Sequence, residues 1–218
     1  MDSTPAPRRV LLAGATGLVG QALLRALLLD PAVGSLQVLA RRSPGVDHPK
    51  LATHVVDFSA LPALSGIDEV YLALGTTIKV AGSQAAFRAV DLDANLAVAR
   101  AAFKAGARRL GVVSAMGADS GSRVFYNRVK GELEDAVAAL GFEGVVIARP
   151  SLLTGDRAAL GQPARAGERI GAVAMSVLRP FIPADYRSIK AADVAHALLA
   201  HVPQSQGKII LRSGAMQR

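Results

Sequence analysis

The stretch that decides the fold is residues 10–29, which read VLLAGATGLVGQALLRALLL. Its first part, Val10–Ala13, is continuously apolar, and this pattern predicts a strand buried on both faces within a parallel sheet. Its last part, Leu18–Leu29, carries leucines at helical spacing, interrupted by Gln21 and Arg25, which predicts an α-helix with one apolar face. A short turn rich in glycine joins the two. The stretch therefore predicts a strand–turn–helix unit at the start of an α/β protein.

Three glycines, Gly14, Gly17 and Gly20, occupy this turn. A strand that turns sharply into a helix leaves unpaired backbone N–H groups at the helix start, and the helix dipole favours negative charge there. We expect Gly14 to take the tight turn, Gly17 to let a pyrophosphate approach, and Gly20 to let the helix pack closely on the strand. The alternative is a glycine-rich turn that binds nothing. The residues predicted to contact a dinucleotide are Gly14, Ala15, Thr16, Gly17, Leu18, Val19 and Gly20.

The length of 218 residues indicates a single α/β domain, residues 1–218. The chain has no cysteine, which excludes disulfides, zinc–thiolate sites and thiol nucleophiles. The segment Met1–Arg9 has no apolar core and is not a signal peptide. The longest apolar runs, such as Ile170–Leu178, are too short to span a membrane. We therefore expect a soluble, cytoplasmic protein with no membrane partner.

The formal net charge of +8 raises the question of nucleic-acid binding. The basic residues are scattered, stacking aromatics are few, and no helix-turn-helix, zinc-binding or RNA-binding motif accompanies them. A solvated basic surface with an anionic cofactor site is the simpler interpretation, so we expect no nucleic-acid partner. The four histidines have neither metal-ligand spacing nor carboxylate companions, so we also expect no metal site.

Strand-like and helix-like segments alternate along the rest of the chain. The predicted strands are Arg9–Ala13, Leu36–Ala40, His54–Val56, Glu69–Leu74, Leu110–Ser114, Gly144–Ala148 and Lys208–Leu211. The further predicted helices are Gln84–Lys104, Val124–Leu140 and Asp193–Ala200. This alternation predicts a doubly wound parallel sheet of about seven strands with helices on both faces, a Rossmann-type fold. The segment Arg41–Thr53 is too polar and proline-interrupted for us to predict a helix there.

Arg41 and Arg42 follow the second predicted strand, where dinucleotide-binding proteins select their cofactor. In NAD-binding sites an Asp or Glu at this point binds the ribose 2′-hydroxyl, but here no carboxylate occurs before Asp47. Two guanidinium groups suit a 2′-phosphate, which they bind through charge-assisted hydrogen bonds. We therefore expect NADP as the cofactor. The alternative is a solvated arginine pair at a strand end.

Two further loops at strand ends belong to the predicted cofactor site. Asp57 and Phe58 follow the third strand, where contact with the adenine ring is expected, although an aspartate that starts a turn fits the pattern nearly as well. The fourth strand ends in Leu74, Gly75, Thr76 and Thr77. A glycine here lets the backbone approach a ligand, because the carboxyl ends of parallel strands form the binding crevice. The two threonines either hydrogen-bond the ribose or cap the turn.

The chain resembles the short-chain dehydrogenase/reductase superfamily in its atypical or extended form. The features that carry the resemblance are the G-x-x-G-x-x-G turn and the Y-x-x-x-K pair formed by Tyr126 and Lys130. Further segments that resemble the family are Val90–Ser114, Arg149–Pro150, Leu152–Leu153, Ile189 and Asp193–Ala195. The resemblance spans nearly the whole chain. It implies a nicotinamide cofactor, with Pro150 and Leu152 among the residues that contact it.

Within the superfamily, the chain resembles most closely the Tat-interacting-protein-like subgroup. The stretches concerned are Leu74–Thr77, Ser114–Asp119 and Tyr126–Glu132. Bacterial members of this subgroup are often labelled nucleoside-diphosphate-sugar epimerases on the basis of fold alone. These motifs are specific for the superfamily but not for a substrate, so a nucleotide-sugar epimerase-like or dehydratase-like activity is one alternative function.

Tyr126 and Lys130 lie four residues apart, so on a helix they share one face. A neighbouring ammonium stabilises a phenolate and lowers its pKa from about 10, which makes tyrosine a usable acid or base. The resemblance implies that Lys130 also contacts the nicotinamide ribose and that Ser114 polarises the substrate oxygen. Many relatives carry a second hydroxyl at the next position, where this chain has Ala115. Successive strand residues point to opposite faces of a sheet. If the active hydroxyl belongs at position 115, it is therefore missing from this chain, and Ser114 is structural.

The region expected to bind the substrate, about residues 151–187, is short for the extended family. It suits a small substrate or, instead, a protein partner. The leading hypothesis is an NADP-dependent oxidoreductase acting on a small carbonyl or alcohol. In it Tyr126 exchanges a proton with the substrate, Lys130 lowers the pKa of the tyrosine, and Ser114 orients the substrate oxygen. The second hypothesis is an NADP-binding regulatory or scaffold protein without turnover. A homodimer is compatible with either.

The first testable prediction concerns the choice of cofactor. Replacing Arg41 and Arg42 together by alanine should abolish a preference for NADP of at least about tenfold, because each charge-assisted bond is worth ~1.5–3 kcal/mol. Calorimetric titration of both proteins with NADPH and NADH measures the ratio of affinities. Equal affinity of the wild-type protein for the two nucleotides, or an unchanged ratio in the double variant, would contradict the prediction.

Overall fold

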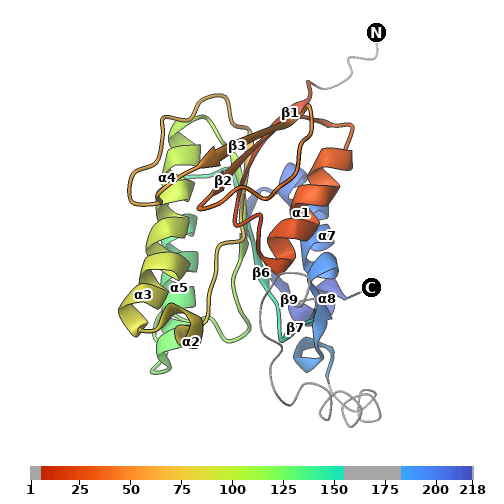
Figure 1. Cartoon of the computed structure of the whole chain (residues 1–218). Coiled ribbons are helices and arrows are strands. Elements are labelled where there is room, and N and C mark those ends of the chain that lie inside the picture. Colours follow the sequence, from red (N-terminus) through yellow and green to blue (C-terminus); the bar gives the residue numbers. More distant parts are fainter. Residues whose placement is uncertain (1–5, 155–182, 218) are drawn as a thin grey trace.

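A computed structural model describes residues 6–154 and 183–217, and a parallel sheet lies at its centre (Figure 1). The strands are β1 (Arg8–Ala13), β2 (Val33–Ala40), β3 (Leu51–Val55), β4 (Glu69–Leu72), β5 (Arg109–Val113), β6 (Gly144–Arg149) and β9 (Gly207–Arg212). Their order is β3-β2-β1-β4-β5-β6-β9, and every neighbouring pair is parallel. The strand order reverses direction between β1 and β4. This arrangement confirms the doubly wound α/β fold and all seven predicted strands.

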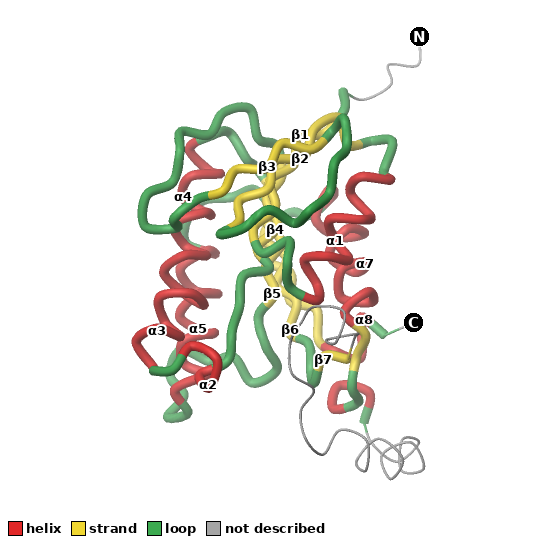
Figure 2. Tube along the Cα trace, in the orientation of Figure 1, coloured by secondary structure: helices red, strands yellow, loops and turns green. Residues whose placement is uncertain are grey.

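Helices cover both faces of this sheet (Figure 2). On one face lie α1 (Leu18–Leu29) and α7 (Ala191–His201), which pack side by side. On the other face lie α3 (Gln84–Arg88), the π-helical turn η1 (Ala89–Ala94), α4 (Asn95–Lys104) and α5 (Phe125–Ala138). The shorter elements are α2 (Ile78–Ala81), η4 (Ala184–Tyr186), η5 (Val202–Gln204), α8 (Ser213–Met216) and the paired strands β7 (Leu153–Thr154) and β8 (Ile189–Lys190).

The strand β1 shows why the central strands are apolar along their whole length. Val10 and Leu12 pack in the apolar layer of α1 and α7, whereas Leu11 and Ala13 pack in the layer of α4 and α5. All four side chains are fully buried. Because helices cover both faces of a parallel sheet, a continuous apolar run rather than an alternating one specifies such a strand.

The two crossovers next to β3 contain no helix in the described chain. Residues 41–50, between β2 and β3, form turns and irregular structure, as their polar composition suggests. Residues 56–68 then lead back to β4, also without a helix. This second loop still covers the sheet, because some of its apolar side chains pack against the layer of α4 and α5. These are Val56, Phe58, Leu61 and Leu64.

The prediction of one continuous helix over Gln84–Lys104 is wrong in its middle, where the structure has the π-helical turn η1. The side chain of Asn95 accounts for the wider turn. Its Nδ2 donates to the backbone oxygens of Val90 (3.3 Å) and Asp91 (3.1 Å), and also to that of Leu74 (3.2 Å) after β4. A side chain that inserts into the hydrogen-bond ladder distorts a helix, and hydrophobic periodicity does not report such an insertion.

The predicted substrate region, residues 151–187, lies mostly outside the described residues. The described chain before and after this gap comes together, because β7 pairs with β8 and Oγ of Ser151 donates to the backbone oxygen of Arg187. Among the helices within residues 6–154 and 183–217, none combines the length and the apolar character needed to cross a membrane.

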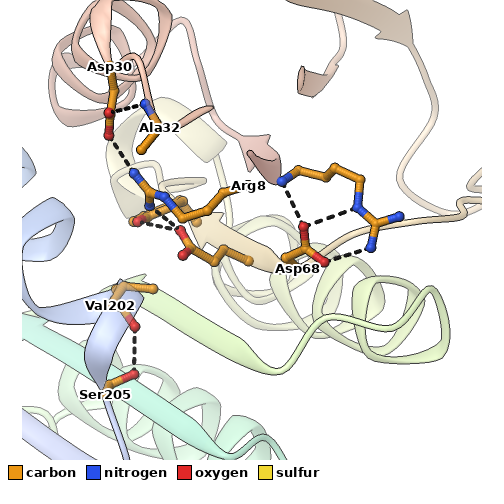
Figure 3. Close-up of polar contacts among 9 residues, drawn as sticks. Arg8, Asp30, Ala32, Asp68, Val202 and Ser205 are labelled. Carbon is orange, nitrogen blue, oxygen red and sulfur yellow. Dashed lines mark hydrogen bonds and ion pairs between the residues drawn. The ribbon is translucent and has the colours of Figure 1, made fainter. Parts of the chain in front are cut away.

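A buried charge cluster lies at the edge of the sheet where β1 and β4 begin (Figure 3). Arg8 donates to Glu69 (2.8 Å) and pairs with Asp30 just after α1. The hydroxyl of Tyr71 also donates to Glu69 (3.1 Å), whose side chain is 3% exposed. Burial raises the pKa of Glu69, and the charge of Arg8 opposes this rise. The cluster therefore depends on Arg8 to compensate a carboxylate that is largely removed from water.

The second prediction concerns this cluster. Arg8→Met should lower the free energy of unfolding by about 1–3 kcal/mol near neutral pH, because the buried carboxylate of Glu69 loses its charged donor. Burial holds the folded-state pKa of Glu69 above its ordinary value, so acid protonates this group and removes its need for a counter-charge. The loss should therefore grow as the pH rises through that pKa. Urea unfolding of both proteins at about pH 4 and about pH 7 measures it.

The neighbouring arginine supplies a matched control. Arg9 pairs with Asp68 at 2.7 Å, but both side chains are substantially exposed. Arg9→Met should therefore change stability little, since exposed ion pairs are weak. An equal loss in the two variants, or an Arg8→Met loss that does not depend on pH, would show that the burial of Glu69 is not the cause.

Candidate functional site

The glycine turn between β1 and α1 lies against the carboxyl end of β4. Gly14 has φ +91°, and a Cβ there would lie 2.4 Å from the backbone carbon and oxygen of Ala73. A Cβ on Gly20 would lie 1.9 Å from the carbonyl oxygen of Gly14. The fold itself therefore requires both glycines: Gly14 makes the tight turn, and Gly20 lets α1 begin directly against it. These conformations match the structural roles predicted for the two residues.

Gly17 differs because no neighbouring atom of the described chain requires it. It is the N-cap of α1 with φ −84° and ψ 169°, angles that other residues adopt. A Cβ there would meet Gly14 O at 3.5 Å, an ordinary contact. The first turn of α1 has no acidic residue, and its first amides have no partner within the helix. These open amides at the positive end of the dipole fit a pyrophosphate.

The remaining residues of the turn differ in exposure. Ala15 and Val19 are buried in the core, so they would meet a ligand through the backbone. Thr16 and Leu18 are partly exposed. Their contact with a dinucleotide stays a prediction.

Arg41 and Arg42 follow β2 directly and are both exposed. They lie near the glycine turn, because β2 pairs with β1 up to Leu39 opposite Ala13. Among the residues that the structure describes, neither guanidinium has a hydrogen-bond or ion-pair partner. Both groups are therefore available to a phosphate, and the solvated alternative fits the same geometry.

The adenine-side residues Asp57 and Phe58 follow β3. Oδ1 of Asp57 accepts a hydrogen bond from the backbone N of Ser59 (2.9 Å), which lowers the pKa of Asp57. This carboxylate thus starts a turn, as the alternative interpretation had it. Phe58 is half-buried against the core. An open hollow of about 500 Å³ lies beside them, lined by His54–Asp57 and Ala60–Pro62.

The loop after β4 is tied to the neighbouring helices by its polar groups. Thr77 caps α2, since its Oγ1 accepts from the backbone N of Val80 (3.2 Å). The backbone N of Thr76 donates to Oδ2 of Asp91 in η1 (2.9 Å). The carbonyl of Leu74 accepts from Nδ2 of Asn95, the side chain that widens η1. Thr77 is therefore a cap, the second of the two roles considered for it.

The helix α5 carries Tyr126 and Lys130 about one turn apart. Lys130 is buried, and its ammonium forms an ion pair with Asp91, with 2.7 Å between Nζ and Oδ1. Gly75 lies next to this pair, because a Cβ there would lie 3.5 Å from Asp91 Oδ1 and 4.0 Å from Lys130 Nζ. The ring of Tyr126 is partly exposed and packs against Phe87, with 5.4 Å between ring centroids.

Sequence reasoning did not include Asp91 among the site residues. The signal was a charged residue within an otherwise apolar helical stretch, but Asp93 follows two positions later. Because residues two apart do not share a helix face, the sequence does not indicate which of the two is buried. In the structure the two lie on different sides of η1: Asp91 is fully buried, whereas Asp93 is exposed.

Ser114 follows β5, and its hydroxyl donates to Oε1 of Glu134 on α5 (2.5 Å). Glu134 is 1% exposed and forms an ion pair with Arg149 at the end of β6, with 2.6 Å between Nη2 and Oε2. A serine hydroxyl has one proton to donate, and here a carboxylate accepts it. This arrangement supports the structural alternative that Ala115 raised. The catalytic role of Ser114 stays a prediction, and sequence reasoning missed its two partners.

The last predicted contacts lie in the loop after β6. Pro150 is buried, and its carbonyl accepts from the backbone N of Met116 (2.9 Å). Leu152 is 52% exposed. Their contact with a cofactor is untested by this geometry. Within residues 6–154 and 183–217, no group of three or more His, Asp and Glu side chains is placed to hold a metal ion.

Comparison with known proteins defines the class. A family model described as NAD(P)H-binding matches residues 14–204, from the first glycine of the turn to the end of η5. The chain therefore belongs to this NAD(P)H-binding family, and its fold is a Rossmann fold. The resemblance stated from the sequence motifs is confirmed at this level.

Individual relatives are similar over about two thirds of their length. "Protein fmp52, mitochondrial" of Emericella nidulans is 40% identical over 158 residues, 68% of this chain and 68% of that protein. "Protein FMP52, mitochondrial" of Candida albicans is 38% identical over 152 residues, 66% of each. A short-chain dehydrogenase/reductase superfamily protein of Agrobacterium tumefaciens with bound NAD has a TM-score of 0.70 at 16% identity, covering 94% of this chain and 77% of that one. This last likeness shows the fold alone.

The names of these relatives place them in mitochondria, which contradicts the cytoplasmic location expected from the sequence. That expectation rested on an N-terminal segment without an apolar core. Such an observation argues against secretion, but targeting segments for mitochondria are amphipathic and rich in arginine, so they lack an apolar core as well.

The third prediction tests the glycine turn. Gly17→Val should abolish dinucleotide binding, because the side chain would occupy the space where a phosphate must approach the amides of α1. The fold should persist, since an added Cβ would lie 3.5 Å from Gly14 O, an ordinary van der Waals contact. Calorimetric titration with NADPH, together with a thermal melt, measures both quantities.

Gly20→Ala is the matched control. Its Cβ would lie 1.9 Å from Gly14 O, so this variant should lower the melting temperature as well as affinity. A Gly17→Val protein that binds NADPH as tightly as the wild type would show that the turn does not bind pyrophosphate.

Proposed function

We propose that the protein is an NADP-preferring oxidoreductase of the short-chain dehydrogenase/reductase type that acts on a small carbonyl or alcohol substrate. One observation carries the proposal: the glycine turn and the buried lysine meet the same short loop. Gly14 touches the backbone at Ala73, and two residues later Gly75 lies against Lys130 Nζ. The dinucleotide turn and the Y-x-x-x-K helix are thus joined at one edge of the sheet.

Each part of this edge suits one part of the cofactor. The open amides of α1 would bind the pyrophosphate, and Arg41 with Arg42 would bind a 2′-phosphate. Gly75 leaves the backbone open beside Lys130, which suits the nicotinamide ribose. When bound, the dinucleotide supplies or accepts a hydride.

The chain itself must then handle the proton. Tyr126 lies in the first turn of α5 and is partly exposed, whereas Lys130 lies one turn deeper and is buried. The tyrosine hydroxyl is the group that would exchange a proton with the substrate oxygen. The buried ammonium provides the positive charge that favours the phenolate in that exchange.

A second candidate function is an NADP-binding regulatory protein without turnover, whose ligand state controls contact with a protein partner. The observation that favours it is the hydrogen bond from Ser114 to Glu134. This bond commits the hydroxyl that the oxidoreductase hypothesis assigns to the substrate oxygen. Consumption of NADPH with a panel of small aldehydes and ketones separates the two candidates.

The fourth prediction tests the proton-transfer group. Tyr126→Phe should lower kcat by about 10²–10⁴-fold while changing NADPH affinity little, because the ring remains and the proton relay is lost. Lys130→Ala should reduce both rate and affinity. Steady-state kinetics with the best carbonyl of the panel, combined with NADPH titration, measures these effects.

Tyr71→Phe is the matched control, because it removes a tyrosine hydroxyl at the other edge of the sheet. It should alter stability without a comparable loss of rate. Turnover that survives Tyr126→Phe would refute the mechanism, and a panel that consumes no NADPH would favour the regulatory function.

A further inference from the structure

A buried polar node connects three elements next to Gly75. It consists of the backbone N–H of Thr76, the carboxylate of Asp91, the side chain of Asn95 and the ammonium of Lys130. The carboxylate of Asp91 contacts both the amide of Thr76 and the ammonium of Lys130. Its Oδ2 accepts from Thr76 N (2.9 Å), and its Oδ1 lies 2.7 Å from Lys130 Nζ. The side chains of this ion pair are 1% and 5% exposed, respectively for the aspartate and the lysine.

The π-helical turn brings Asp91 to this place. In a regular helix the residue would be rotated relative to its present direction, since a π-turn adds one residue to the turn. The side chain of Asn95 holds the widened turn by donating to Val90 O and Asp91 O, and it donates to Leu74 O as well. The same amide thus fixes both the turn and the loop after β4. Such π-helical turns are rare, and they occur frequently at functional sites.

Lys130 needs such a partner for a physical reason. A lysine ammonium is a point charge on a flexible stem, and a buried one without a counter-ion is costly. Asp91 supplies the counter-charge on the side of η1, and Gly75 adds no side chain beside the pair, since even a Cβ there would lie 4.0 Å from Lys130 Nζ. Asp91 therefore holds the buried ammonium beside Gly75, an exposed residue of the loop after β4.

We propose that Asp91 is a positioning residue: it holds the Lys130 ammonium beside Gly75 and thereby sets the affinity for the dinucleotide and the rate of the reaction. The inference rests on the proposed function, since it assumes that a nicotinamide cofactor binds along this edge. Asp91 acts through Lys130 and is not itself a group that touches the substrate.

The fifth prediction follows. Asp91→Asn keeps the side-chain shape and an acceptor for Thr76 N but removes the negative charge. NADPH affinity should fall about tenfold, which is within the range of interaction energies measured between residues in contact. Turnover should fall further, by about 10²-fold, because a misplaced lysine no longer supports the reacting groups. In a Lys130→Met background, Asp91→Asn should cause no further loss of affinity. Calorimetric titration, kinetics and thermal melts of the four proteins complete this cycle.

Two further variants exclude a purely structural role. Glu69→Gln removes another buried, ion-paired carboxylate, but at the opposite edge of the sheet, and should leave NADPH affinity unchanged whatever it does to stability. Asp91→Glu keeps the charge and should recover most of the affinity lost in Asp91→Asn. It also provides a folded variant with an altered carboxylate position if Asp91→Asn does not fold.

The outcomes separate the two proposals. Wild-type affinity in Asp91→Asn, or additive losses of affinity with Lys130→Met, would overturn the role of Asp91 and leave the proposed function intact. If Asp91→Asn is not folded, wild-type affinity and turnover in Asp91→Glu would overturn it. A wild-type protein that binds neither NADPH nor NADH would overturn both. Coupled losses of affinity in a protein that turns over no carbonyl would support Asp91 and refute the oxidoreductase.

Discussion

The close approach of the first turn to the sheet is the constraint on which the rest of the structure depends. With no side chain at Gly14 or Gly20, the turn lies against the backbone at Ala73, and α1 starts immediately above it. A Cβ at either position would overlap backbone atoms, which cannot move aside as the end of a side chain can. This approach sets α1 over the sheet and leaves the amides at its start open at the carboxyl edge of the strands.

The two edges of the sheet use buried charge differently. At the starting edge, Arg8 and Glu69 compensate one another and Tyr71 adds a further hydrogen bond, so the charges are satisfied within the fold. At the carboxyl edge, Asp91 pairs with Lys130 beside Gly75, an exposed residue of the loop after β4. A buried ion pair contributes little net stability compared with apolar packing, and the position of this pair beside Gly75 is the basis of the role proposed for Asp91.

The structure also changes the interpretation of the serine after β5. The motif places Ser114 where a catalytic hydroxyl is expected, yet Glu134 and Arg149 occupy its surroundings. These residues lie 20 and 35 positions away along the chain, so spacing within a motif could not reveal them. The same holds for Asp91, which a regular helix would have turned elsewhere.

The sequence by itself determined the local features of the fold and the site. These are the continuously apolar strands, the glycine turn and the tyrosine–lysine pair on one helix. These features follow from local rules, because burial on both faces, a positive φ and helical spacing each depend on a few neighbouring residues. Tertiary structure alone decided which charges meet, as with Lys130 and Asp91, and which hydroxyl is already engaged, as with Ser114. Such contacts join segments distant in the chain, and their geometry depends on how whole elements pack, which no local pattern of residues encodes.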